Sequence, residues 1–280
     1  MKIITPLVQI DDAGRIWGKL EAFSRTGSIK DRIVDYICDK AALDGKLSSD
    51  STIIEASSGN TGIALASYAA ILRCRCIIIM PRNMSQQRKD MMKAFGAEII
   101  ETGDNEFKEA IEMRDALVSK NGWFSPNQFS NRLNTACHYE ETAPEIYQQL
   151  ADIHPYKWGV FLHGAGTGGT MMGVKKFIDD ECLDIKCVLV CPEEDAKDHG
   201  IQGINDGANF LLDKTMMSDI ISISTVDAIN RMKRFWRENG ILVGISSGAN
   251  ILASERYLEK MKNPDLAIIT ILADRGERYL

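Results

Sequence analysis

One lysine, Lys30, stands where a side-chain amine could do covalent chemistry. It follows the small residues Thr26, Gly27 and Ser28 and precedes a stretch whose apolar residues recur with a helical period. The positive end of a helix dipole and partial burial both disfavour a charged amine. They would lower the pKa of a lysine held there and leave a neutral nucleophile near neutral pH. The plainer interpretation is a surface lysine at a helix N-terminus, a position that the dipole disfavours.

A second group of polar residues lies in the segment SSGNT, residues 57–61. A β-branched run before it predicts a strand, and an apolar helical period after it predicts a helix. Backbone N–H groups at a helix N-terminus favour an anion, and this segment adds side-chain donors from Ser57, Ser58, Asn60 and Thr61. The segment is therefore either an anion site or a helix cap in a tight turn.

A glycine-rich turn follows an expected strand in the second half of the chain. Gly164, Gly166 and Gly169 fit the pattern G-x-G-x-x-G, which is typical of a dinucleotide site. Glu193 and Glu194 lie roughly where such a site needs an acid. A nicotinamide-dependent oxidoreductase is therefore one interpretation of this turn.

Thr167 and Thr170 beside these glycines favour a different ligand, a terminal phosphate held by backbone N–H groups and hydroxyls. A third small-residue turn, VGISSGAN at 243–250, could place the hydroxyl of Ser246 or Ser247 against a ligand heteroatom. Its plainer interpretation is another helix cap.

One cofactor would use all four features. Pyridoxal phosphate needs a lysine for its aldehyde, an anion cradle for its phosphate and a partner for its ring nitrogen. Its amino-acid substrate needs a second anion site for the carboxylate. Lys30 and the three turns offer one of each, whereas a dinucleotide leaves Lys30 and the 57–61 segment without a role.

The order of apolar segments predicts how these turns are positioned. Short β-branched runs alternate with helical periods, which predicts an α/β fold of mostly parallel strands covered on both faces. The expected strands are 51–56, 75–80, 97–101, 158–163, 186–191 and 266–273, and the expected helices include 62–72, 85–96 and a long one from about Asn105. Because each half carries its own strand–turn–helix unit, we expect two three-layer α/β domains with a cleft between them.

The composition excludes several classes of protein. The chain has 280 residues and a formal net charge of −6, so we expect neither nucleic acid nor an anionic membrane as its main partner. No apolar run approaches the roughly 20 residues that cross a bilayer. Seven cysteines without a C-x-x-C pair and histidines without metal-like spacing predict reduced thiols, no metal site and a cytoplasmic location.

Several motifs, in order, resemble the cysteine synthase (O-acetylserine sulfhydrylase) family, which belongs to the tryptophan-synthase-β-like (fold type II) pyridoxal-phosphate enzymes. They run from TPLVQI near the N-terminus through TGSIKDR, SSGNTG and NQFSN to DRGERYL at the end. The resemblance implies a smaller, mobile domain at 24–135 that binds the substrate carboxylate. It also implies a larger domain, made of 1–23 and 136–280, that binds the cofactor phosphate.

The resemblance also implies roles for individual residues. Lys30 would form the internal aldimine, Asn60 would bond the ring hydroxyl, and Ser246 would face the pyridine nitrogen. The residues implied for the substrate carboxylate are Ser57, Ser58, Thr61 and Gln128. The residues implied for the phosphate are Gly166, Thr167, Gly168, Gly169 and Thr170. A neutral hydroxyl at the ring nitrogen suits β-elimination and β-replacement better than transamination.

The implied reaction is β-replacement on an activated serine, O-acetylserine or similar, with sulfide to give L-cysteine by way of an aminoacrylate. Lys30, once freed, would remove the Cα proton. An alternative within the same chemistry is cysteine breakdown with release of sulfide, or reaction with a larger thiol or water. The resemblance further implies a homodimer and serine acetyltransferase as a partner. A non-catalytic relative that senses or binds a partner is the remaining class.

The chain departs from the family in the segment HGIQGINDGANF, residues 199–210. The family pattern there is Gly-Ile-Gly-Ala-Gly, whereas this chain has Gly-Ile-Asn-Asp-Gly at 203–207. In the family this loop faces the substrate. Asp206 would then repel an anionic nucleophile or act as a base on water or a bulkier thiol; the plainer interpretation is a solvent-facing turn residue.

Overall fold

The computed structural model describes residues 3–57, 59–104, 107–152, 156–195, 198–204 and 210–280. The chain divides into two compact units, which are described separately. The small unit is Ser28–Leu133, and the large unit combines Lys2–Gly27 with Asn134–Leu280. The assignment of carboxylate binding and phosphate binding to separate domains stays a prediction.

The small unit is built on a parallel sheet of three strands in the order β3-β4-β5. These strands are β3 (Thr52–Ala56), β4 (Arg75–Pro81) and β5 (Glu98–Thr102). The helices of this unit are α1 (Lys30–Leu43), α2 (Asn60–Leu72), α3 (Gln86–Ala94) and α4 (Phe107–Asn121).

Both faces of the small sheet are covered. Ile54 and Ile79 pack in one apolar cluster with Ala110 of α4. Ile78, which alternates with Ile79 along β4, lies within 3.2 Å of the position that a Cβ would take on Gly62 of α2. Since side chains alternate across a strand, α2 and α4 lie on opposite faces.

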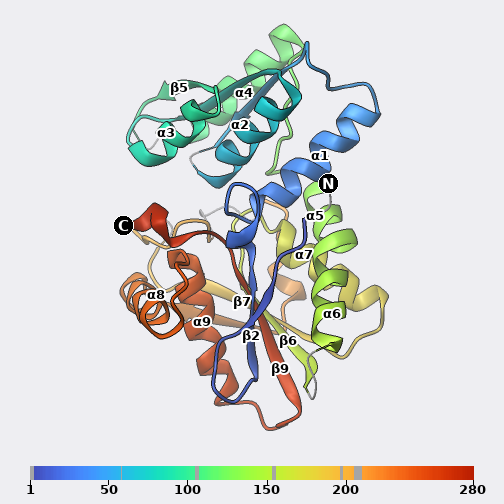
Figure 1. Cartoon of the computed structure of the whole chain (residues 1–280), viewed down its shortest axis with the longest axis vertical. Helices are drawn as coiled ribbons and strands as arrows, with labels where there is room; N and C mark the ends of the chain where they lie inside the picture. The colour runs from blue at the N-terminus through green and yellow to red at the C-terminus, as the bar shows by residue number, and fades with distance from the viewer. Residues whose placement is uncertain (1–2, 58, 105–106, 153–155, 196–197, 205–209) are drawn as a thin grey trace. The chain divides into compact units, whose positions relative to one another are not determined.

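The large unit contains a sheet of six strands in the order β1-β2-β9-β6-β7-β8, in which every pair is parallel except β1 with β2. The strands are β1 (Leu7–Gln9), β2 (Ile16–Leu20), β6 (Lys157–Gly164), β7 (Lys186–Pro192), β8 (Asp219–Ile223) and β9 (Leu266–Leu272). Figure 1 shows α8 and α9 on one side of this sheet and α6 on the other.

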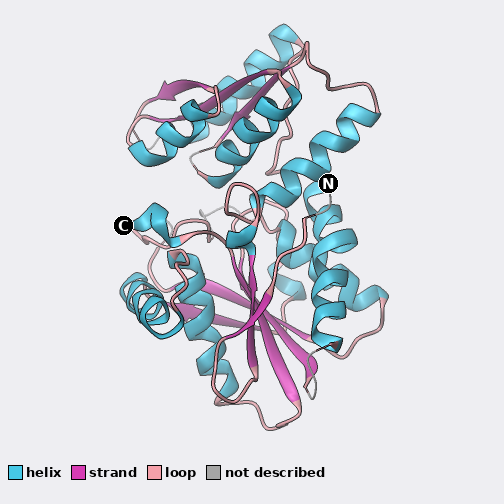
Figure 2. Cartoon of the chain, viewed as in Figure 1, coloured by secondary structure: helices cyan, strands magenta, loops and turns pink. Residues whose placement is uncertain are grey.

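The helices of this part are α5 (Leu133–Cys137), the π-helix η2 (His138–Thr142), α6 (Ala143–Ala151), α7 (Gly169–Asp180), α8 (Thr225–Asn239) and α9 (Ile245–Leu258). Short 3-10 turns are η1 (Glu21–Phe23), η3 (Lys214–Met216) and η4 (Gly276–Tyr279). Figure 2 shows the strands of the sheet running between these helices. None of the helices in the described ranges is long and apolar enough to cross a membrane.

The six expected strands are all present, and the prediction of parallel α/β sheets is confirmed. The sequence did not predict β1, β2 and β8. β2 was missed because Gly18 and Lys19 interrupt its apolar run; Lys19 is nonetheless fully buried, with its ammonium donating to Thr5 O at 2.5 Å and to Gln149 Oε1 at 2.6 Å. β8 closes one end of the sheet and is half exposed, so it lacks a continuous apolar signal.

Candidate active site

Lys30 is the first residue of α1, and its side chain is half-buried. The turn before it needs a glycine, because Gly27 has φ +82° and a Cβ there would lie 2.6 Å from Cδ of Arg275. The backbone N–H of Arg275 donates to Gly27 O at 3.1 Å, and the Arg278 guanidinium donates to Thr26 O. The C-terminal segment, to which the sequence analysis assigned no role, therefore holds the turn that ends three residues before Lys30.

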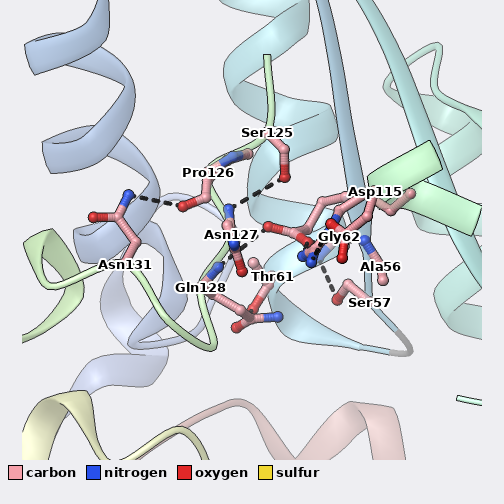
Figure 3. Close-up of polar contacts among 12 residues, drawn as sticks. Ala56, Ser57, Thr61, Gly62, Asp115, Ser125, Pro126, Asn127, Gln128 and Asn131 are labelled. Carbon is pink, nitrogen blue, oxygen red and sulfur yellow. Dashed lines mark hydrogen bonds and ion pairs between the residues drawn. The ribbon is translucent and has the colours of Figure 1, made fainter. Parts of the chain in front are cut away.

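Ser57 lies three residues before α2 in the small unit, where Gly59 holds the N-cap position. Its Oγ accepts the backbone N–H of Gly62 at 2.9 Å, at the beginning of α2 (Figure 3). Asn60 is the first residue of α2 and is half-buried. Ser58 lies outside the described residues. Since Ser57 uses an acceptor lone pair on Gly62, its hydroxyl proton is directed to another acceptor.

Gln128 joins this turn through its side chain. Thr61 Oγ1 donates to Gln128 Oε1 at 2.6 Å, and both residues are buried (Figure 3). This bond fixes the orientation of the Gln128 amide beside Thr61. The structure thus brings Ser57, Thr61 and Gln128 together around the N-terminus of α2.

A buried ion pair lies beneath this cluster. Arg114 Nη1 lies 2.7 Å from Glu55 Oε1, with Glu55 fully buried and the Arg114 side chain 3% exposed. Burial raises the pKa of Glu55 above its ordinary value, and the guanidinium of Arg114 counteracts that rise. This pair was not predicted from the sequence, although one acid inside the apolar strand TIIEA was a signal that could have revealed it.

The glycine-rich turn of the large unit leaves no room for side chains. A Cβ on Gly166 would lie 2.5 Å from Gly203 O, and one on Gly168 would lie 2.5 Å from Leu212 N. Gly168 also has φ +89°, and it precedes α7, whose N-terminus has no side-chain cap among the described residues. The N–H of Gly169 makes a long hydrogen bond, 3.4 Å, to Thr167 Oγ1, and the N-terminus of α7 remains suited to an anion.

Both threonines of this turn are buried and held by neighbours that the sequence did not predict. Asn134 Nδ2 donates to Thr167 Oγ1 at 3.0 Å. Thr170 Oγ1 lies 3.2 Å from His138 Nε2, and the other ring nitrogen of His138 lies 2.9 Å from Thr142 Oγ1. These contacts fix the orientation of the two hydroxyls beside the uncapped helix.

Helix α9 is anchored to the same edge of the large sheet. Asn250 Oδ1 accepts the N–H of Gly164 at 2.9 Å, and Asn250 Nδ2 donates to Ile271 O at 2.8 Å. Ser246 is buried on the same face of α9, one turn closer to its N-terminus. The hydroxyl of Ser247 instead accepts the N–H of Ala273 at 3.1 Å, which leaves Ser246 as the hydroxyl suited to a ligand.

Residues 2–274 match the family described as pyridoxal-phosphate dependent enzymes. The chain belongs to this family. It is 36% identical to a cysteine synthase of Staphylococcus aureus over 292 residues, covering 99% of this chain and 92% of that protein. The fold, the pyridoxal phosphate cofactor and the kinship with cysteine synthases, all predicted from the sequence, are confirmed.

Solved structures give the same result. A cysteine synthase from Entamoeba histolytica is 37% identical with a TM-score of 0.90, covering 99% of this chain and 87% of that one. A hydrogen sulfide-producing enzyme from Fusobacterium nucleatum is 35% identical with a TM-score of 0.90, covering 99% of this chain and 96% of that one.

The residues present fit this pyridoxal-phosphate family better than they fit a dinucleotide enzyme. A helix N-terminus with no side-chain bond from its N-cap, glycines that leave no room for a Cβ and two buried threonines suit a phosphate ester. Glu194, one of the two candidate acids of a dinucleotide site, accepts the N–H of Thr225 at 2.7 Å at the N-terminus of α8, and this bond holds its pKa below the usual range. Asp206 lies outside the described residues.

Proposed function

We propose that this pyridoxal-phosphate enzyme catalyses β-replacement on O-acetylserine or a similar activated serine, with sulfide as the nucleophile and L-cysteine as the product. The observation that carries the proposal is a neutral hydroxyl, Ser246, in place of a carboxylate where α9 begins. The likeness to the cysteine synthases of Staphylococcus aureus and Entamoeba histolytica supports it.

The cofactor, when bound, supplies an electron sink that makes the Cα proton acidic and lets the β-substituent leave. We assign to Lys30 the covalent attachment of the cofactor and, once released, the removal of the Cα proton by its Nζ. The position of Lys30 at the beginning of a helix suits a proton acceptor, because the helix dipole disfavours the charged form of its amine. Asn60 and Ser246 would bond the ring oxygen and the ring nitrogen.

The phosphate would lie on the turn 166–170. The backbone N–H groups at the N-terminus of α7 would donate to it, together with the hydroxyls of Thr167 and Thr170. Asn134 and His138 orient these hydroxyls before the ligand arrives. A preorganised cradle of this kind loses little conformational entropy on binding.

The substrate carboxylate would lie at the N-terminus of α2. Ser57 would donate its hydroxyl proton, and Gln128 would donate through its amide nitrogen. Thr61 donates its hydroxyl proton to Gln128 Oε1. We therefore assign to Thr61 a backbone N–H contact with the carboxylate rather than a hydroxyl contact. Ser58 remains predicted from the resemblance alone. Holding the carboxylate at several points keeps Cα and Cβ aligned for reaction.

A second candidate is the release of sulfide from cysteine. The likeness to the sulfide-producing enzyme of Fusobacterium nucleatum favours it, and Asp206 stays a predicted contributor to this chemistry. The homodimer, the serine acetyltransferase partner and the cytoplasmic location stay predictions from the sequence.

The test is a pair of assays on the purified holoenzyme, with Lys30→Ala as the control that should be inactive in both. One supplies O-acetylserine with sulfide and measures cysteine; the other supplies cysteine alone and measures sulfide. We expect faster turnover in the first assay. Turnover in the second assay only would replace the proposed synthesis with cysteine breakdown.

A further inference from the structure

We infer that the buried ion pair of Glu55 and Arg114 is a positioning device for the substrate carboxylate site, an inference that rests on the proposed function. Neither residue is placed against substrate or cofactor. Both act through Gln128 and through the turn that begins at Ser57.

The burial of the pair calls for a physical reason. Glu55 is fully buried and Arg114 is 2% exposed. Two charges lose their hydration when they are buried, and apolar side chains of the same volume are often at least as stabilising. A buried ion pair is therefore weak evidence for stability, and the contacts of this pair indicate a different role.

The carboxylate of Glu55 connects three segments of the small unit. Its Oε1 accepts Arg114 Nη1 of α4 at 2.7 Å and the N–H of Ala56, at the end of β3, at 2.9 Å. Its Oε2 accepts the backbone N–H of Gln128 at 3.3 Å. Arg114 is itself held from the other side, because its Nε donates to Asp115 Oδ1 at 2.9 Å.

Each of these contacts leads to a residue of the predicted carboxylate site. Ala56 directly precedes Ser57, whose Oγ accepts the N–H of Gly62 in the first turn of α2. Gln128 carries the amide that Thr61 orients. The carboxylate of Glu55 therefore sets both the end of the strand and the backbone of Gln128, and a shift of either would move the donors that face the substrate.

The segment around Gln128 is a tight turn held by its own hydrogen bonds, so that a shift of the Gln128 backbone would move the turn. Asn127 has φ +48°, an uncommon backbone conformation for a residue other than glycine. The side chain of Asn131 donates to Pro126 O at 2.8 Å, and Ser125 Oγ accepts the N–H of Asn127 at 3.3 Å (Figure 3). The Glu55 bond to Gln128 is one polar link between this tight turn and β3, and the backbone bonds of Phe124 to Thr52 and Ile54 are others.

The large unit offers a matched control. Arg231 is also a buried arginine, with a side chain 4% exposed, and its Nη2 lies 2.8 Å from Glu255 Oε1. This pair links α8 and α9 and contacts none of the predicted site residues in the described part of the chain. Its loss should cost stability without changing the carboxylate site.

The experiment compares Glu55→Gln and Arg114→Lys with Glu255→Gln in the holoenzyme. Glu55→Gln keeps the shape and one acceptor but removes the charge. We expect its KM for O-acetylserine to rise about tenfold or more, with the visible absorption of the bound cofactor and the affinity for pyridoxal phosphate unchanged. We expect Arg114→Lys to show a smaller rise in KM, since one donor to Glu55 is retained, and Glu255→Gln to lower Tm with KM unchanged.

A titration with L-serine, followed through the cofactor absorption, keeps this test separate from the proposed function. If the wild-type enzyme binds L-serine but makes no cysteine, the proposed function fails and the titration still tests the ion pair. Weaker L-serine binding in Glu55→Gln, with unchanged binding of ethanolamine, which lacks the carboxylate, supports the inference. A Tm loss equal to that of Glu255→Gln, with L-serine affinity and KM at wild-type values, would overturn it.

Discussion

The two proposed anion sites of this protein share one arrangement of strand, turn and helix but differ in the groups that form them. In both, a parallel strand ends, a short turn follows, and a helix presents its N–H groups. In the turn 164–170 the backbone itself is the cradle, because atoms of Gly203 and Leu212 approach so closely that a Cβ is excluded. In the turn 57–61 side chains form the cradle, and a buried ion pair at Glu55 supports them.

This difference matches the two ligands that we assign. A cofactor phosphate stays bound through many turnovers, so a rigid backbone cradle suits it. A substrate carboxylate enters and leaves in every cycle, so hydroxyl and amide donors whose orientation depends on neighbours suit it better. Both turns depend on residues far along the chain. Backbone atoms of Gly203 and Leu212 confine the glycine turn, whereas a buried charged pair, Glu55 with Arg114, supports the turn at Ser57.

The largest expected effect comes from adding one methyl group to the glycine-rich turn of the large unit. Gly168→Ala would place a Cβ 2.5 Å from the backbone nitrogen of Leu212 at a φ of +89°. We expect a loss of about 2 kcal/mol or more in unfolding free energy and loss of the bound cofactor. The cofactor absorption and thermal unfolding measure both.

The matched control for that variant is Gly59→Ala in the other turn. Among the described residues its Cβ would meet only the guanidinium of Arg88, with Nη1 at 3.4 Å, and Gly59 has a negative φ of −156°. We expect cofactor content to stay at the wild-type value. If Gly59→Ala lost the cofactor as fully as Gly168→Ala, the distinction between the two cradles would be wrong.

A second prediction concerns the pH dependence of stability in Arg114→Met. Burial raises the pKa of Glu55 and Arg114 works against it, so removal of Arg114 raises this pKa further. The carboxyl of Glu55 then keeps a proton in the folded state at a pH where the unfolded state has released it. The free energy of unfolding therefore falls as pH rises toward the new pKa, by at most about 1.4 kcal/mol per pH unit. Chemical unfolding across this pH range checks the slope.

The control for this slope is the double variant Glu55→Gln/Arg114→Met, which has no carboxyl to titrate at residue 55. Its stability should follow the pH dependence of the rest of the protein. A steep slope that persists in the double variant would assign the effect to another group.

The smallest expected effects come from a crossed pair of hydroxyl deletions. Thr61→Val removes the donor to Gln128 Oε1, and Thr167→Val removes the acceptor of Asn134 Nδ2. Loss of one such bond is worth about 1 kcal/mol, or about fivefold. We expect Thr61→Val to raise KM for O-acetylserine and Thr167→Val to weaken pyridoxal phosphate binding. The reverse pattern would exchange the roles of the two sites.

Local sequence was enough to predict the elements that carry the site. Three elements lie where the local pattern indicates: the strand before Ser57, the glycine turn and the helix that begins at Lys30. Each is formed by residues that are neighbours in the sequence. The turn chemistry of Gly168 could be anticipated for the same reason, because a left-handed residue before a helix is a local requirement.

The supporting contacts could not be predicted, because they join residues that are distant in the sequence. Arg114 lies 59 residues from Glu55, and Asn250 lies 86 residues from Gly164. The periodicity of apolar residues in the sequence does not predict contacts between residues so far apart. The choice of Ser246 over Ser247 likewise needed the fold, since only the bond from Ala273 shows which hydroxyl is already used.

The most direct test of the account concerns the side chain of Lys30. Treatment of the purified holoenzyme with borohydride fixes the cofactor on the amine to which it is bound, and peptide mass mapping then locates it. We expect a pyridoxyl group on the peptide that contains Lys30 and none in Lys30→Ala. A pyridoxyl group on a different lysine of the wild-type chain, or labelling that persists in the variant, would contradict it.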